Sequence, residues 1–144
     1  MIKQYLLLLI AIFSCNTEPQ AIDYNVDDCV YCKMKISDPK FGTEVVTDKG
    51  KVYKFDSIEC LLEWIKGNRE VPLNNIVVTD YQNPHSFITA NTAVYLISEK
   101  QASPMGGNLS AYAENSVVQK RINEIGGQMY DFEQLKKWFN TDMR

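Results

Sequence analysis

Two strand-to-helix units, far apart in the chain, place the strongest constraint on the fold. Residues 52–56 lead directly into an apolar-periodic segment that ends at 64–65, and residues 129–133 lead into a similar segment that ends at 138–139. Short β-branched or aromatic runs followed by such segments are typical of strands that feed helices. We therefore expect a single small domain of two weakly repeated strand–strand–helix units, related by a pseudo-twofold axis.

A β-hairpin and a capped helix are predicted for the first unit. The runs 43–47 and 51–55 flank an Asp-Lys-Gly turn, which favours a hairpin. Asp56 is a suitable N-cap, Glu59 completes a capping box with it, and Gly67 is a stop signal for the helix. Further elements are expected as strands at 75–79, 93–97 and 109–113, a helix before the Gly-Gly pair at 126–127, and a helix over 132–140 with a capping box of Asp131 and Gln134.

The beginning of the chain, 1–14, is expected to be a lipoprotein signal peptide that lies outside the fold. Lys3 supplies a positive charge, and the apolar run 5–13 is too short to span a bilayer. The run ends in Ile-Phe-Ser-Cys, which matches a lipobox and predicts a diacylglycerol on the thiol of Cys15. The alternative is an ordinary secretory signal with a chance cysteine.

The chain from Cys15 onward divides into a lipidated tether, 15–26, and a single domain, 27–144. The tether is polar and lacks periodicity. A lipid holds the chain at a membrane surface without spanning it, and Asn16 is no clear retention signal, so the outer membrane is preferred over the inner membrane. The net charge of −3 and the lack of a basic run argue against a nucleic-acid partner.

Sulfur-bearing side chains gather in two segments of the predicted domain. The first is Cys-Val-Tyr-Cys-Lys-Met at 29–34, and the second is Ser-Pro-Met-Gly-Gly at 103–107. Thiolates and thioethers are the soft ligands that select Cu(I) over harder metals. Met34 would lie on the same side of an extended segment as Cys32, and Met105 lies in a loop of the kind usually found at the surface. These residues predict a Cu(I) site, provided that the repeat brings the two segments together.

The Cys-x-x-Cys spacing of Cys29 and Cys32 also has other interpretations. A disulfide is as compatible with this spacing as a metal site, and a redox pair is a further alternative. Zinc is disfavoured because the chain has no second Cys/His pair and has one histidine, His85, in a predicted loop. Cys60 lies on the apolar side of a predicted helix, where a buried structural thiol is the favoured interpretation.

Taken together, these motifs resemble those of the NosL family, the nitrous oxide reductase accessory lipoproteins that act as copper chaperones. The resemblance rests on the lipobox cysteine and on the segments 28–36, 53–57, 80–81, 87–90 and 103–112. The cysteine–methionine segment and the Pro-Met-Gly segment are fairly specific when they occur together. Two positions depart from the family pattern, because Lys33 stands where the family often has glycine and Phe87 replaces a tryptophan.

The resemblance implies an α+β fold similar to that of organomercurial lyase, and a monomeric periplasmic Cu(I) carrier rather than an enzyme. Cys32 and Met34 match the family's Cys-x-Met ligand pair, Met105 matches its Pro-Met ligand, and Cys29 matches the first cysteine of the motif. The carrier would deliver copper to apo-nitrous oxide reductase through an ABC-transporter-type assembly complex. The alternatives are an exported thiol–disulfide oxidoreductase that uses Cys29 and Cys32, and a structural lipoprotein with a disulfide between them.

Overall fold

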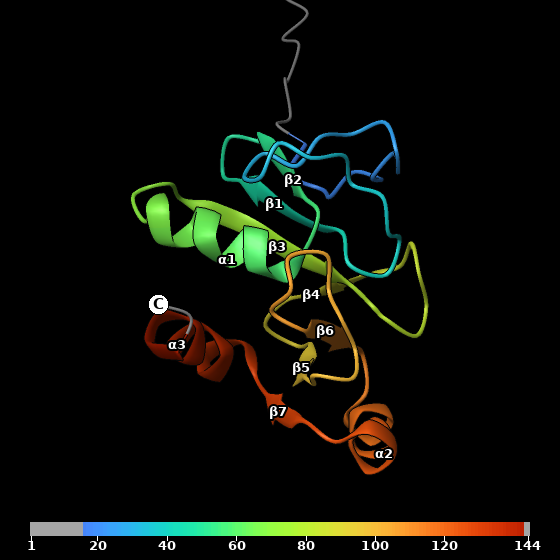
Figure 1. Ribbon diagram of the computed structural model, residues 1–144. Helices are drawn as coiled ribbons and strands as arrows, with labels where there is room; N and C mark the ends of the chain where they lie inside the picture. The colour runs from blue at the N-terminus through green and yellow to red at the C-terminus, as the bar shows by residue number, and fades with distance from the viewer. Residues whose placement is uncertain (1–15, 143–144) are drawn as a thin grey trace, which may run out of the picture.

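The computed structural model describes residues 16–142, which form two antiparallel sheets and three helices (Figure 1). The predicted α+β class is confirmed. The signal peptide expected at 1–14 and the lipidated Cys15 lie outside the described residues. The strands are β1 (Thr43–Thr47), β2 (Val52–Phe55), β3 (Leu73–Thr79), β4 (Phe87–Thr89), β5 (Val94–Ile97), β6 (Leu109–Tyr112) and β7 (Gln128–Tyr130). The helices are α1 (Ile58–Gly67), α2 (Asn115–Ile125) and α3 (Phe132–Asp142).

The first sheet has the strand order β2-β1-β3-β4, and neighbouring strands are antiparallel. The predicted hairpin pairs Thr43 with Phe55 and Val46 with Val52. Gly50 at its turn has a φ of 76°, a conformation that glycine adopts without steric cost. Strand β1 is buried along its whole length, because it lies between two strands and contacts α1.

The second sheet has the order β6-β5-β7 and is also antiparallel. Tyr95 and Leu96 of the central strand β5 are fully buried, the first in the main core and the second in a smaller cluster with residues of β6 and α2. Helix α3 contacts β5 and β7. The strand–helix pairs β2–α1 and β7–α3 correspond to the two units expected from the sequence. The sequence pattern does not predict β4, whose three residues are too few to show a period.

The starts of two helices test the expected caps. On α3, Asp131 N–H donates to Gln134 Oε1 and Gln134 N–H donates to Asp131 Oδ1, so the predicted capping box is confirmed. The capping box predicted for α1 is wrong. Ser57, not Asp56, is the N-cap, and its hydroxyl oxygen accepts a hydrogen bond from Cys60 N–H at 3.3 Å. The carboxylate expected in that box is therefore free to bind elsewhere.

The first described residues lie against the first sheet. Gln20 N–H donates to the carboxylate of Glu44 on β1 at 2.8 Å, and Ile22 is buried in the main core. The segment expected as a tether, 15–26, thus contacts the domain, and Asn16 already lies close to the glycine in the turn of the first hairpin. Within the described part of the chain, no helix combines the length and the apolar character needed to cross a membrane.

Candidate metal centre

The first sulfur segment forms a tight loop at the edge of the first sheet. Cys29 N–H donates to the carbonyl oxygen of Met34 at 2.8 Å, which closes the loop. Val30 N–H donates to the carbonyl oxygen of Lys54 at 2.9 Å, which joins the loop to the edge strand β2. The prediction that Cys32 and Met34 lie on one side of an extended segment is therefore wrong, because the backbone turns between Cys29 and Met34.

Lys33 adopts a left-handed backbone conformation in this loop, with a φ of 66°. Its N–H donates to the carbonyl oxygen of Cys29 at 3.0 Å, so the conformation is part of the turn itself. A residue with a Cβ atom is disfavoured there by roughly 1–2 kcal/mol, whereas glycine adopts it freely. The motif described above often has glycine at this position, and the left-handed conformation gives a physical reason for that preference.

The loop brings two thiols next to a third thiol on helix α1. The Sγ atoms of Cys29, Cys32 and Cys60 all lie within 4.8 Å of one another, and all three thiols are free. Cys29 and Cys60 are each 1% exposed, whereas Cys32 is partly exposed. Cys60 is buried, as predicted, but the purely structural interpretation missed its position beside the other two sulfurs. The structure makes Cys60 a third candidate cysteine ligand, beside Cys29 and Cys32.

Hydrogen bonding makes Cys29 the thiolate of this cluster. The Cys60 thiol has the largest effect on Cys29 Sγ and stabilises a negative charge on it, Cys32 N–H donates to the same sulfur at 3.5 Å, and Asp56 N–H and the Cys32 thiol act in the same direction. Against the opposing effect of burial, these donors lower the pKa of Cys29 from 9.0 to about 5. The bond to Cys29 raises the pKa of Cys60, and burial raises the pKa of Cys32. At neutral pH the cluster therefore carries one negative charge, which suits a monovalent soft cation.

The two methionines of the predicted site are exposed, Met34 by 49% and Met105 by 39%. Met105 lies in the loop between β5 and β6, and two hydrogen bonds join this loop to α1. Ser103 Oγ and Gly107 N–H, the latter at 3.0 Å, both donate to Glu59 Oε1. Figure 1 shows this loop, in orange, beside the start of α1. Both sulfur segments thus lie next to the first turn of α1.

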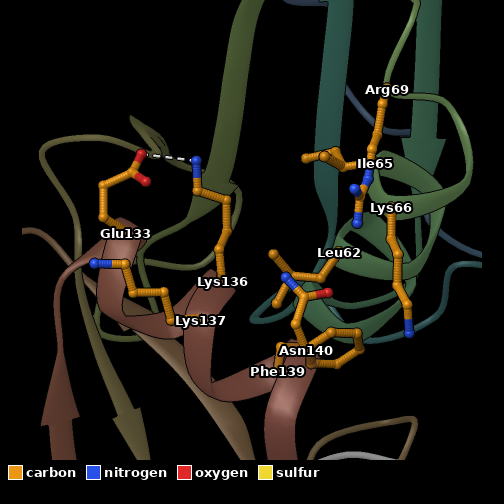
Figure 2. A pocket seen from close by; sticks show the side chains of 9 residues that line it. All are labelled: Leu62, Ile65, Lys66, Arg69, Glu133, Lys136, Lys137, Phe139 and Asn140. Atoms are coloured by element: carbon orange, nitrogen blue, oxygen red, sulfur yellow. Dashed lines mark ion pairs between the residues drawn. The ribbon is translucent and has the colours of Figure 1, made fainter.

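Two other features of the described chain offer no comparable site. His85 packs edge-on against the ring of Tyr24, with 5.1 Å between ring centroids, and does not belong to the thiol cluster. A cleft of about 350 Å³ lies between α1 and α3 (Figure 2). Its lining combines apolar side chains with charged ones, most of which are basic. One of its lysines, Lys136, is paired with Glu133 at 2.7 Å. Since no thiol, thioether or histidine lines the cleft, the thiol cluster is the candidate metal centre.

Comparison with known proteins finds a family and a solved structure to which the chain is similar. The NosL family profile matches residues 20–139. The structure is similar to the crystal structure of the copper chaperone NosL from Shewanella denitrificans, with a TM-score of 0.73 and 25% sequence identity, covering 83% of this chain and 96% of that chain. Among curated proteins, none matches the chain. The family match begins at Gln20, where the described contacts with strand β1 also begin.

Proposed function

The chain belongs to the NosL family, and on that basis we propose that it is a lipid-anchored chaperone that carries Cu(I) for the maturation of a copper enzyme, with nitrous oxide reductase as the recipient. The three clustered thiols carry this proposal. Thiolate sulfur is a soft ligand that prefers Cu(I), and the similar solved structure is that of a copper chaperone. The chain then acts by holding and transferring a metal ion, without catalysing a reaction.

The cysteines form the inner part of the proposed site. Cys29 is ionised at neutral pH, so it can accept the cation without first losing a proton. Recruitment of Cys32 and Cys60 as further thiolates releases their protons, because thiol ligands bind metals in the deprotonated form. The burial of Cys29 and Cys60 shields the bound ion from water. These sulfurs account for retention of the metal.

Met34 and Met105 form the outer part of the proposed site. A neutral thioether binds Cu(I) less strongly than a thiolate, and both side chains are exposed to an incoming ligand. A Cβ atom built on Gly106 would meet no atom within 4 Å, so a partner can approach the backbone next to Met105. The partner's soft ligands would replace the thioethers first and the thiolates afterwards, so copper moves by ligand substitution.

The cellular setting is proposed from the N-terminal motif and the family. A lipid on Cys15 and the tether, 15–26, hold the domain, 27–144, on the periplasmic side of a membrane, with the outer membrane preferred. Acyl chains contribute about 0.8 kcal/mol per buried methylene, and confinement to a surface raises the effective concentration of carrier and recipient. The proposed partners are apo-nitrous oxide reductase and its ABC-transporter-type assembly complex, and the carrier is a monomer.

A thiol–disulfide oxidoreductase acting on exported cysteines is the second candidate function. The low pKa of Cys29 and the nearby thiol of Cys32 favour it, because a thiolate is the attacking species in disulfide exchange. However, Cys29 is 1% exposed, and this function gives Met34 and Met105 no chemical role. The copper proposal accounts for both the thiols and the exposed thioethers.

An anaerobic Cu(I) titration of the reduced, lipidated chain in detergent, against a colorimetric chelator, tests the copper proposal. We expect stoichiometric copper binding that competes with the chelator and weakens in Cys32→Ser. A reduced protein that leaves all copper on the chelator contradicts the proposal. In that case, turnover of a disulfide substrate that depends on both Cys29 and Cys32 would establish the oxidoreductase instead.

A further inference from the structure

The carboxylate of Glu59 joins helix α1 to the loop that carries Met105. Glu59 is 3% exposed, and its Oε1 accepts hydrogen bonds from Ser103 Oγ and from Gly107 N–H. Its second oxygen, Oε2, is buried and has no hydrogen-bond partner among residues 16–142. Within the described chain, the hydrogen bonds of this buried carboxylate therefore all run to the loop.

The two donors flank Met105 in the loop. Gly106 N–H donates to the carbonyl oxygen of Ser103 at 3.0 Å, and Gly106 has a φ of 77°, so a turn forms with Met105 inside it. Gly107 has a different reason to be glycine. A Cβ atom at Gly107 would lie 2.7 Å from Glu59 Oε1 and 2.8 Å from Glu59 Cγ. Glycine at this position thus permits the close approach of the loop to the carboxylate.

We propose that Glu59 is a positioning residue of the metal site, which holds the turn around Met105 against the start of α1. Cys60, the next residue of the helix, contributes one thiol of the cluster, so a single turn of α1 places both this thiol and the thioether loop. Met105 is 39% exposed, so its own packing fixes the loop weakly, and hydrogen bonds to a carboxylate are among the strong ones. This inference rests on the proposed function through the role of Met105 as a ligand.

Holding the loop in place lowers the cost of metal binding. A free loop would have to be ordered when its thioether binds the ion, and the lost conformational freedom would reduce the affinity. If Glu59 served stability alone, the effect of its replacement on Cu(I) affinity would not depend on whether Met105 is present. If Glu59 acts through Met105, the effects of changing the two residues are not additive, and a double-mutant cycle measures that dependence.

The experiment measures Cu(I) affinity of the full lipidated chain by chelator competition. We expect Glu59→Ala and Met105→Leu to weaken binding by similar factors, on the order of tenfold, and the double variant to be no weaker than Met105→Leu. Glu59→Gln keeps an oxygen acceptor and should retain most of the affinity. Glu63→Ala is the matched control, because Glu63 lies one turn further along α1, is partly exposed and pairs with Lys66 at 3.9 Å. It should leave the affinity unchanged.

Two results overturn the positioning role, namely wild-type affinity in Glu59→Ala and a further loss in the double variant. Should Glu59→Ala fail to fold, Gly107→Ala gives the same test from the loop, since its methyl group displaces the carboxylate. Gly107→Ala is expected to match Met105→Leu in affinity, and wild-type affinity in a folded Gly107→Ala overturns the role in the same way.

A second readout is independent of copper. The ¹³C-methyl signal of Met105 in the copper-free protein should move to the random-coil position in Glu59→Ala and stay in place in Glu63→Ala. An unchanged signal in Glu59→Ala overturns the inference. A wild-type chain that binds no Cu(I) removes the proposed function, and this methyl signal then still decides whether Glu59 holds the loop.

Discussion

The thiols and the thioethers of the proposed site lie in contrasting surroundings. Cys29 and Cys60 are each 1% exposed and share a hydrogen bond, whereas Met34 and Met105 are 49% and 39% exposed and lie in loops. A buried thiolate binds a soft cation strongly, and an exposed neutral thioether is readily replaced by another ligand. The contrast favours a division of tasks in the proposed site, with inner sulfurs that would retain the ion and outer sulfurs that would exchange it.

Replacing the thiolate should have the largest effect and tests this division directly. In Cys29→Ser, the sulfur that is ionised at neutral pH is lost. We expect Cu(I) affinity, measured by chelator competition, to fall by more than the roughly 10–100-fold typical of changes around a metal site. Met129→Leu is the control, because Met129 is 40% exposed on β7 and should not affect binding. A loss no larger than that of Met34→Leu would contradict the division into inner and outer ligands.

The hydrogen bond within the cluster gives the next largest effect. Cys60→Ala removes the proton donor of Cys29, so the pKa of Cys29 should rise from about 5 toward its ordinary value of 9.0. Cys60→Ser keeps a donor and should stay closer to the wild type. The ultraviolet absorbance of the thiolate, followed against pH in the copper-free protein, measures both. Identical titrations in the wild type and Cys60→Ala would show that the backbone donors and the Cys32 thiol stabilise the thiolate without Cys60.

The same pKa shift should make folding stability depend on pH. Between about pH 5 and pH 9 the folded chain holds Cys29 deprotonated while the unfolded chain holds it protonated, so stability rises with pH in this window. The contribution is complete above pH 9 and is lost as the pH falls through about 5. Urea unfolding of the copper-free protein measures it. We expect a smaller slope in Cys60→Ala and the loss of this slope in Cys29→Ser. An unchanged slope in Cys29→Ser would remove Cys29 as its source.

Much of the fold was predictable because side-chain periodicity is a local property of the sequence. The runs 43–47 and 109–113 correspond to β1 and β6, and the last helix has the expected capping box. The site was less predictable, because Cys60 meets the other thiols only through the packing of α1 beside the loop at 29–34. One sequence signal pointed to it. Three cysteines remain after Cys15, and Cys60 is the one that is not part of the Cys-x-x-Cys motif. An unpaired cysteine of this kind is a candidate third ligand for the pair.

Glu59 and Lys33 show why local patterns misled at the site itself. Glu59 has the spacing of a capping box, yet its carboxylate binds a loop 48 residues further along the chain. Long-range packing therefore overrides a local signal. Lys33 gives no sign of a left-handed conformation, since lysine rarely adopts one. The surrounding loop imposes that conformation through its hydrogen bonds.

Lys33→Gly should have the smallest effect of the changes considered, and it acts on folding stability through the backbone beside the sulfurs. Both thioethers neighbour a left-handed residue, Lys33 with a φ of 66° beside Met34 and Gly106 with a φ of 77° beside Met105. Lysine in this region costs roughly 1–2 kcal/mol, and the greater freedom of glycine in the unfolded chain offsets part of the gain. We expect Lys33→Gly to stabilise the copper-free protein by about 0.5–1 kcal/mol, measured from the urea midpoint.

Asn108→Gly is the matched control for this backbone effect. Asn108 has a φ of 59°, but asparagine adopts the left-handed region more readily than lysine, so its replacement should stabilise the protein less. Neither change removes a sulfur, and Cu(I) affinity should stay constant in both. A loss of stability in Lys33→Gly would have a specific meaning. The hydrogen bond from Lys33 Nζ to the carbonyl oxygen of Val30, at 2.5 Å, would then outweigh the backbone strain and hold the loop around the thiols.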